Sequence, residues 1–349
     1  MDRASRRPRI ADVAHAAGVS KTAVSFAFNS PERLSADTAV RIREVADSLG
    51  YRPNPVARLL TQRETMTLGV LTPQALAVVF SNPFFALFSE GVAHAAEDLG
   101  YGLHFISPLH GSLALAVGRA TVDGVVAIGL SADHPEVGQI QAAGLPMVLV
   151  DSDDLADYSS VVVDDEAGAR AAAEHLLGLG HRDILILAVE GPESAGGQPN
   201  RQGVSERRLR GYRAALRTAE VELASDHVVA GRASIEGGAS AFLRAWAAGV
   251  RPTAALAMSD AMAIGATRGA REHGLRVPDD LSVIGFDDID LAAYLDPPLT
   301  TVRQPIREKG STAVRLLIEA IAGRSQPEHV SLETRLVVRN SAGPPPTGN

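Results

Sequence analysis

Four apolar runs of this sequence end in polar side chains that could hold a small polar ligand. If these runs are parallel strands, their carboxyl ends lie along one edge of a sheet, where open α/β sheets bind ligands. Aspartate accepts hydrogen bonds from hydroxyl groups, and serine both donates and accepts them. The repeated placement predicts a cleft for a small polar molecule. The runs are PMVLVDS (146–152), SSVVVDD (159–165), AALAMSD (254–260) and LSVIGFDD (281–288).

A second chemistry is indicated near the N-terminus, in the run IADVAHAAGVSKTAVSFAF from Ile10 to Phe28. Apolar residues at i, i+3, i+4 and i+7 predict a first helix, and Gly18 ends it because glycine adopts a left-handed backbone at little cost. Ser20 is a good N-cap for a second helix. Two helices joined by a tight glycine turn form a helix-turn-helix, whose second helix usually enters the DNA major groove.

The start of this second helix carries the side chains that would contact bases. Lys21 could reach guanine O6 and N7, and Thr22 could meet a thymine methyl or a base amide. Phe26 lies one turn further along. Its ring either packs on a thymine methyl or packs beside Phe28 in the core of the head, and the sequence leaves both alternatives open.

Charge and a third helix support a DNA-binding head. Ser35 caps a helix that Gly50 ends, so three helices can close a core of roughly 45 residues. Residues 1–63 hold 11 Lys and Arg against 6 Asp and Glu, a net charge of +5, whereas residues 64–349 hold 22 against 35, a net charge of −13. A basic head on an acidic body favours phosphate binding by the head. A solvated basic terminus is the alternative.

Composition limits the remaining classes. The chain has no cysteine, which suits a reducing compartment. No secretory signal and no apolar run of about 18 residues are visible, so neither secretion nor a membrane partner is expected. With the DNA-binding head, we expect a bacterial protein of the cytoplasm that is associated with the nucleoid. No histidine or cysteine stands at metal spacing, and a strand end followed by a helix N-terminus accounts for the acidic trio Asp164–Glu166. The sequence therefore predicts no metal site. Because no phosphate-binding glycine motif or GxSxG elbow occurs, neither a cofactor nor an enzymatic activity is expected.

From Thr67 onward, β-rich runs alternate with alanine-rich amphipathic segments. This alternation predicts an α/β fold with parallel sheets covered on both faces, arranged as one large sheet or two smaller ones. The further runs are 67–73, 102–108, 124–130 and 183–189, and helices are expected at 83–99, 166–179, 206–219, 235–248 and 261–272.

The chain resembles the LacI/GalR family of bacterial transcriptional regulators from about Arg9 to Asn340. The motifs occur in the order typical of that family: DVAHAAGVSKTAVS (12–25), LGYRPNPVARLL (49–60), SNPFFA (81–86), VDGVVAIG (122–129), HLLGLGHRDI (175–184), RLRGY (208–212), SDAMAIGA (259–266), VPDDLSVIGFDD (277–288) and LTTVRQP (299–305).

The resemblance implies a helix-turn-helix head and a body similar to periplasmic sugar-binding proteins. The head would span 1–52, a hinge helix or linker 53–63, and the body 64–340. One parallel-sheet subdomain would hold about 64–163 and 303–330, and the other about 164–302 and 331–340. The Gly/Pro-rich segment 341–349 is expected to be disordered.

The resemblance also implies a hinge at Pro53–Leu60 that becomes helical on DNA and wedges Leu60 into the minor groove. The alternative is that Leu59 and Leu60 are linker residues packed on the body. The implied DNA contacts are Ser20, Lys21, Thr22, Ser25, Phe26, Asn29, Tyr51, Asn54, Val56, Ala57, Arg58 and Leu60.

For the ligand cleft, matched positions nominate seven residues from both subdomains. One of the two adjacent phenylalanines is expected in the core, and Asp287 could instead be a helix cap or a structural partner of Arg208. Ala233 stands where several family members place an aromatic wall. The nominated residues are Asn82, Phe84, Phe85, Asp151, Arg208, Ser259 and Asp287.

Together these observations predict a homodimeric repressor that binds near-palindromic double-stranded operator DNA and responds to a sugar-like effector. The alternatives are an activator, a transport-type binding protein and a small-molecule enzyme. The transport-type protein leaves the helix-turn-helix unexplained, and no general-base constellation supports the enzyme.

Overall fold

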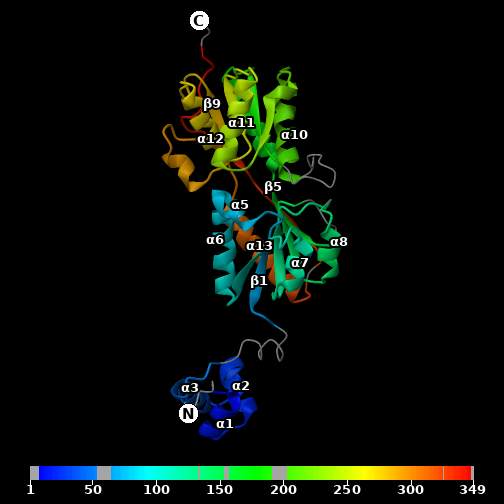
Figure 1. Cartoon of the computed structure of the whole chain (residues 1–349), viewed down its shortest axis with the longest axis vertical. Coiled ribbons are helices and arrows are strands. Elements are labelled where there is room, and N and C mark those ends of the chain that lie inside the picture. Colours follow the sequence, from blue (N-terminus) through cyan, green and yellow to red (C-terminus); the bar gives the residue numbers. More distant parts are fainter. Residues whose placement is uncertain are drawn as a thin grey trace. The chain divides into compact units, whose positions relative to one another are not determined.

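The computed structural model describes residues 8–52, 64–132, 134–152, 157–190, 203–324 and 326–346. The chain forms two compact units, a head that ends at Thr65 and a body that begins at Met66. Figure 1 shows the elements of each unit. Among the described residues, no helix is long and apolar enough to cross a membrane.

The head is a bundle of three short helices around a small core. Gly18 ends the first helix with φ 64°, and Ser20 and Ser35 each cap the next helix by accepting a backbone N–H bond. These caps confirm the predicted helix-turn-helix. The elements are α1 (Ile10–Ala17), α2 (Lys21–Asn29), the 3-10 turn η1 (Pro31–Arg33) and α3 (Ala36–Ser48), and the core holds Val13, Ala14, Ala17, Val24, Ala27, Ile42, Ala46 and Tyr51.

The body consists of two lobes, each built on a six-stranded sheet. All strands of the lobe-one sheet are parallel, in the order β11-β5-β4-β3-β1-β2. Each predicted β-rich run contains a strand, and the alternative of one large sheet is excluded. The lobe-one strands are β1 (Thr67–Leu71), β2 (Gly102–Ile106), β3 (Gly124–Ile128), β4 (Met147–Val150), β5 (Ser159–Val163) and β11 (His329–Leu332).

The lobe-two sheet has the order β12-β10-β9-β8-β6-β7 and is parallel except for β12, which pairs antiparallel with β10. The chain therefore passes between the lobes three times: after β5, after β10, and between β11 and β12. The lobe-two strands are β6 (Ile184–Val189), β7 (Val228–Gly231), β8 (Ala254–Ala257), β9 (Ser282–Asp287), β10 (Thr300–Arg303) and β12 (Arg335–Val337).

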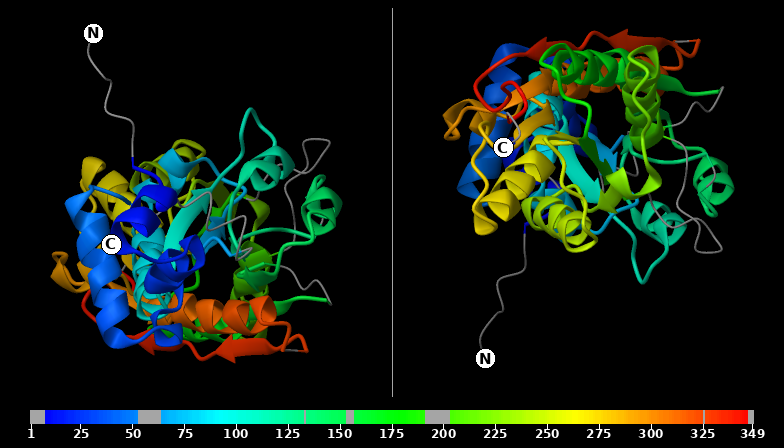
Figure 2. Two further views of the ribbon diagram at one scale, coloured as in Figure 1. Left: turned by 90° about the horizontal axis from the view of Figure 1, so that it is seen from below. Right: turned by 90° about the horizontal axis from the view of Figure 1, so that it is seen from above.

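Helices cover both faces of both sheets, as the near-continuous apolar strands predicted. In lobe one, α6 and α13 pack on one face, and α7 and α8 pack on the other. In lobe two, α9 and α10 face α11 and α12 across the sheet (Figure 2). The helices are α5 (Leu76–Ser81), α6 (Pro83–Asp98), α7 (Leu113–Arg119), α8 (Val137–Ala142), α9 (Asp165–Gly178), α10 (Gly203–Thr218), α11 (Ile235–Ala247), α12 (Asp260–Glu272) and α13 (Ile306–Ile321), with 3-10 turns η2 (Ser225–His227) and η3 (Asp290–Tyr294).

One close helix contact positions a site residue. A Cβ atom at Gly211 of α10 would fall on the Glu166 carbonyl oxygen of α9, so only glycine allows these helices to pack this closely. The contact brings Arg208, one turn earlier on α10, next to Asp165 at the start of α9. The RLRGY motif thus fixes the position of a buried cation.

The prediction of disorder from residue 341 onward is wrong for residues 341–346. Ser341 is buried, and its hydroxyl donates to the Val283 carbonyl (2.6 Å) and accepts from the Thr300 N–H (2.8 Å). The Gly343 carbonyl accepts from the buried His181 ring (2.8 Å). These long-range hydrogen bonds anchor a segment whose composition alone indicated no structure. Residues 347–349 lie outside the described residues.

Candidate functional site

In the head, α2 presents the predicted base-contacting side chains at its first turn. Lys21 and Thr22 are exposed, and Ser25 is half-buried one turn later. The Ser20 hydroxyl accepts from the Ala23 N–H at 3.1 Å, which holds the first turn in place. Arg43 of α3 donates to the Ala27 carbonyl (3.1 Å) and ties the two helices together. Among the described residues, the first turn of α2 therefore exposes Lys21 and Thr22.

The two phenylalanines of α2 have different surroundings. Phe28 packs against the head core and lies 6.0 Å from the Tyr51 ring, whereas Phe26 is outside that cluster, with the Arg33 guanidinium 5.2 Å from its ring. The alternative that Phe26 belongs to the core is therefore not supported. Tyr51, nominated as a DNA contact, is only 9% exposed, and burial raises its pKa. The Tyr51 ring is part of the head core. Contact between Tyr51 and DNA stays a prediction.

Several predicted DNA contacts lie outside the described residues. They include every nominated hinge residue, Asn54, Val56, Ala57, Arg58 and the wedge candidate Leu60, and also the side chain of Asn29. The two hypotheses for Leu59 and Leu60 therefore remain open.

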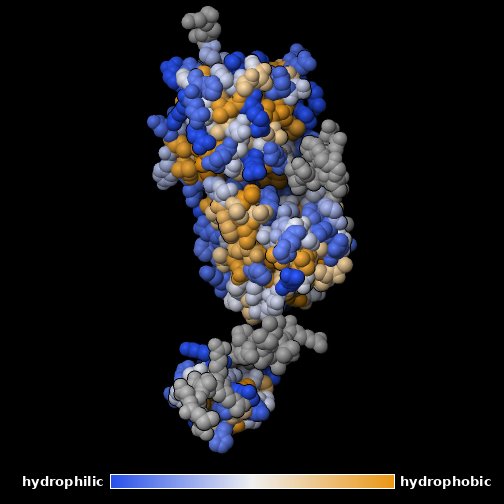
Figure 3. Space-filling view, in the orientation of Figure 1, coloured by the Kyte–Doolittle hydropathy of each residue, from blue (hydrophilic) through white to orange (hydrophobic). Residues whose placement is uncertain are grey.

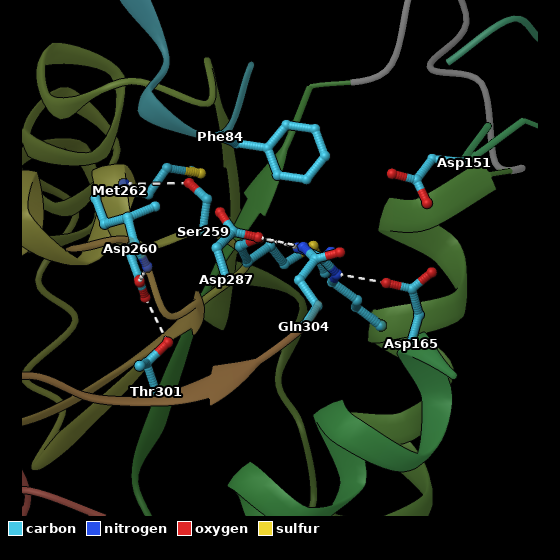
Figure 4. Close-up of polar contacts among 12 residues, drawn as sticks. Phe84, Asp151, Asp165, Ser259, Asp260, Met262, Asp287, Thr301 and Gln304 are labelled. Carbon is cyan, nitrogen blue, oxygen red and sulfur yellow. Dashed lines mark hydrogen bonds and ion pairs between the residues drawn. The ribbon is translucent and has the colours of Figure 1, made fainter. Parts of the chain in front are cut away.

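In the body, all seven nominated cleft residues line one cavity of about 190 Å³ at the carboxyl ends of the strands. Lobe one supplies Asn82, Phe84 and Phe85 at the start of α6 and Asp151 after β4. Lobe two supplies Arg208 from α10, Ser259 after β8 and Asp287 at the end of β9. Figure 4 shows how several of them lie. The cavity is therefore built by both lobes.

Arg208 is the buried cation of the lobe-two wall. Its Nε donates to Asp165 (2.8 Å), Nη1 donates to the Met258 carbonyl and lies 3.8 Å from Asp287, and the guanidinium stacks 3.6 Å from the Phe286 ring centre. Burial disfavours its charge, but Asp165 and Asp287 outweigh that effect and raise the pKa of Arg208. The guanidinium is held charged and in one orientation.

Asp165 is a site residue that the sequence interpretation missed. In the acidic trio, Asp164 caps α9 and Glu166 forms an exposed ion pair with Arg210. The position of these two residues, between a strand end and a helix start, accounts for their charges. Asp165 instead is fully buried and accepts from both Arg207 and Arg208. The signal available was the adjacent arginine pair in RRLRGY, but no local rule links it to residue 165.

Asp287 and Asp151 are joined by a chain of polar contacts that crosses between the lobes. Asp287 accepts from Gln304 Nε2 (2.6 Å), and Gln304 Oε1 accepts from Lys309 Nζ (2.6 Å). Lys309 Nζ also donates to both oxygens of Asp151, each at 2.8 Å. Gln304 belongs to the crossing segment after β10, and Lys309 belongs to α13. Neither was nominated from the sequence, although LTTVRQP contains Gln304. Asp287 therefore accepts from Gln304 and forms an ion pair with Arg208. Of the two structural alternatives for Asp287, the structure shows the pairing with Arg208.

Lys309 is a fully buried cation, with none of its surface exposed. Besides its two bonds to Asp151, it lies 5.4 Å from the Phe84 ring centre, where a cation is attracted to the ring face. Because a buried charge is tolerated only when it is paired, Asp151 and Lys309 hold each other in place. The Asp151 carboxylate is therefore held in one orientation at the cavity wall.

The remaining nominated residues combine lining with local structural roles. Ser259 caps α12 by accepting from the Met262 N–H (3.2 Å), and Asn82 caps α6 by accepting from the Phe84 N–H (3.1 Å). Phe84 is buried in the lobe-one core and stacks on Phe88, whereas Phe85 is half-buried and meets Phe84 edge-on. The expectation that one phenylalanine is core is fulfilled by Phe84.

A helix-turn-helix unit joined to a two-lobed α/β body with an interlobe cavity defines a class: DNA-binding regulators that carry a ligand-binding body. Within the described residues, no cluster of His, Cys, Asp and Glu is arranged to hold a metal ion. Residues 9–54 match the family model of bacterial regulatory proteins, lacI family, and residues 173–342 match a periplasmic binding protein-like domain.

The similarity to known proteins extends over almost the whole chain. The HTH-type transcriptional regulator DegA of Bacillus subtilis is 34% identical, with 96% of this chain and 98% of DegA covered. A structure of the transcriptional regulator CelR–cellobiose complex is 31% identical, with a TM-score of 0.70 and 96% of this chain and 100% of that chain covered. A structure of the lac repressor dimer bound to operator and the anti-inducer ONPF is 28% identical, with a TM-score of 0.80 and coverages of 97% and 100%. The chain belongs to the lacI family and is a DNA-binding transcriptional regulator.

Lys309→Met is expected to lower the free energy of unfolding by about 3 kcal/mol, because it leaves the Asp151 carboxylate buried without its cation. Urea unfolding followed by circular dichroism measures the loss. The double variant Lys309→Met/Asp151→Asn, which removes both charges, should recover part of it. A single variant as stable as the wild type would contradict the buried ion pair.

Asp287 makes stability depend on pH. Burial outweighs Arg208, Gln304 and Lys309 and raises its pKa from 3.8 to about 6 in the folded protein. Its contribution to stability is therefore complete below about pH 4 and is lost as the pH rises through about 6. Between these values, Asp287→Asn should show a smaller fall in unfolding free energy than the wild type. Urea titrations at a series of pH values test this, and parallel pH profiles would refute it. Burial and the Asp287 charge also raise the pKa of Asp260, so removal of that charge changes the contribution of Asp260 in the same direction.

Proposed function

We propose that the protein is a homodimeric repressor whose affinity for a near-palindromic operator is changed by a sugar-like effector bound between the lobes of its body. The observation that carries this proposal is the chain of buried polar contacts that runs from Arg208 to Asp151 and crosses between the lobes. Arg208, Asp287 and Asp151 of this chain line the cavity. A molecule that binds there contacts both lobes at once. Its affinity then differs between arrangements of the lobes, which is the requirement for a switch.

The lining chemistry suits a sugar. The carboxylates of Asp151 and Asp287 accept from hydroxyl groups, Arg208 is a planar donor, and the half-buried Phe85 offers an apolar face to a ring. Two similar proteins support this assignment, since one is described in complex with cellobiose and another as a dimer on its operator. The seven cleft residues are proposed as the effector site.

For DNA, Lys21 and Thr22 are proposed to contact base edges and Phe26 to pack on a thymine methyl. The net charge of +5 on residues 1–63 favours binding to phosphates, and the negative body keeps other surfaces away from DNA. Leu60 is proposed as the minor-groove wedge. The protein would act in the bacterial cytoplasm.

DNA fragments selected by the protein from a random duplex library test the operator interaction. Affinity for the selected duplex should fall by several orders of magnitude between 50 and 200 mM salt, roughly 10³-fold or more for six or more phosphate contacts. Lys21→Ala should weaken the selected duplex about tenfold or more while changing an unrelated duplex less. Arg41→Ala, which removes one charge from the exposed face of α3, is the matched control and should affect both duplexes alike. Affinity without a salt slope would overturn the proposal.

The effector site is tested with the sugar that gives the largest rise in melting temperature in a panel of mono- and oligosaccharides, since bound ligand stabilises by mass action. Arg208→Lys keeps the charge but loses the planar fork, so we expect at least a tenfold loss of affinity for that sugar. The ligand-dependent change in operator affinity should be lost with it. Arg210→Lys, on the same helix but exposed, should respond as the wild type does. An unchanged response of Arg208→Lys would refute the site.

A further inference from the structure

The interlobe cavity opens into a second, larger groove. The groove has a volume of about 760 Å³, against about 190 Å³ for the inner cavity. Most binding sites for small molecules measure about 300–1,000 Å³, so the inner cavity alone is small for a ligand site. Seven residues line both spaces, which makes them continuous: Gln74, Asn82, Phe85, Gly129, Val189, Glu190 and Ala233.

The walls of the groove differ in chemistry. Helix α5 of lobe one contributes Ala77 and Val78, and Val78 is 40% exposed. Figure 3 shows apolar surface over α5. Lobe two contributes polar side chains from the turn after β7 and from α11, among them Arg232, Ser240 and Arg244. An apolar wall facing hydrogen-bonding groups suits a second sugar ring, which has an apolar face and a rim of hydroxyls.

Charge in the groove favours a neutral occupant. The cations Arg232 and Arg244 are balanced by the carboxylates of Glu190 and Glu236, which line the same space. Arg244 is already engaged by Ser240 and the Ala230 carbonyl, and Glu236 lies 4.0 Å from Arg268. These groups can donate to and accept from hydroxyls without a net field that selects an ion.

Ala233 stands at the junction of the two spaces and is held there by a fixed turn. The Ser234 N–H donates to the Arg232 carbonyl (2.8 Å), and the Ser234 hydroxyl caps α11 by accepting from the Gly237 N–H (3.0 Å). A Cβ atom at Gly237 would collide with the Arg232 carbonyl, so the turn packs directly on the helix. A methyl group is all that residue 233 projects into the junction, and a large side chain there would narrow it.

On the basis of the sugar-responsive function proposed above, we propose that the effector is a neutral oligosaccharide of at least two rings, and that Ala233 determines this length. One ring occupies the inner cavity beside Arg208 and Asp287. The next ring lies in the groove between α5 and α11. A single ring fills only the inner cavity and forgoes the contacts with α5 and α11.

Isothermal titration calorimetry with the full chain tests the proposal, using mono-, di- and trisaccharide series of glucose, galactose, mannose and xylose. In one series, the disaccharide or trisaccharide should bind at least tenfold more tightly than its monosaccharide. Ala233→Trp should lower this ratio, the affinity for the longer saccharide divided by the affinity for its monosaccharide, at least tenfold. Ser240→Trp, which fills the outer groove at a residue that does not line the inner cavity, should lower it as well.

Ala247→Trp, at the exposed far end of α11, is the matched control and should keep the wild-type ratio. Monosaccharides that bind as tightly as their longer chains would overturn the oligosaccharide inference while leaving a sugar-responsive regulator intact. Loss of affinity that is equal for every chain length in both tryptophan variants would also overturn it. If no sugar of any length binds, both the inference and the sugar effector of the proposed function fail.

Discussion

The body depends on the mutual compensation of charges that it buries. Arg208, Lys309, Asp151, Asp165 and Asp287 are all less than a tenth exposed, and each of them has an oppositely charged partner. An unpaired charge at any of these positions would cost several kcal/mol, so the positions of the others are constrained. Because Gln304 connects the Lys309–Asp151 pair to the Asp287–Arg208 pair, the same compensation links the lobes. The ligand cavity is lined by groups that the fold has already oriented.

The head follows a different principle, since local signals account for most of it. Its core is small and alanine-rich, and its helices begin and end at residues that satisfy their own termini, such as Ser20, Ser35 and Gly18. Capping of this kind depends on neighbours within three or four residues. The side chains proposed to contact DNA, Lys21, Thr22 and Phe26, lie outside this core.

In the proposed effector site, the two lobes contribute complementary surfaces. Lobe one supplies aromatic and apolar surface from α5 and α6, and lobe two supplies directed hydrogen-bonding groups from α10, β9 and the turn before α11. A ligand with apolar faces and polar edges makes its full set of contacts only when both lobes are near it. The proposed switch follows from this requirement, because ligand binding is coupled to the arrangement of the lobes through the difference in affinity between arrangements.

The sequence by itself determined the helix-turn-helix, the alternating strands and helices, and the polar residues at the strand ends, because periodicity, caps and glycine turns are local properties. The seven nominated cleft residues were found through matched motifs, and the structure gathers them around one cavity. Only the tertiary structure decided that Asp165, Gln304 and Lys309 pair with cleft residues, that Phe26 does not join Phe28 at the head core, and that residues 341–346 are anchored. Each of these outcomes depends on partners far away in the chain. Lys309 lies 158 residues from Asp151, and no local pattern specifies which buried cation will meet which buried carboxylate.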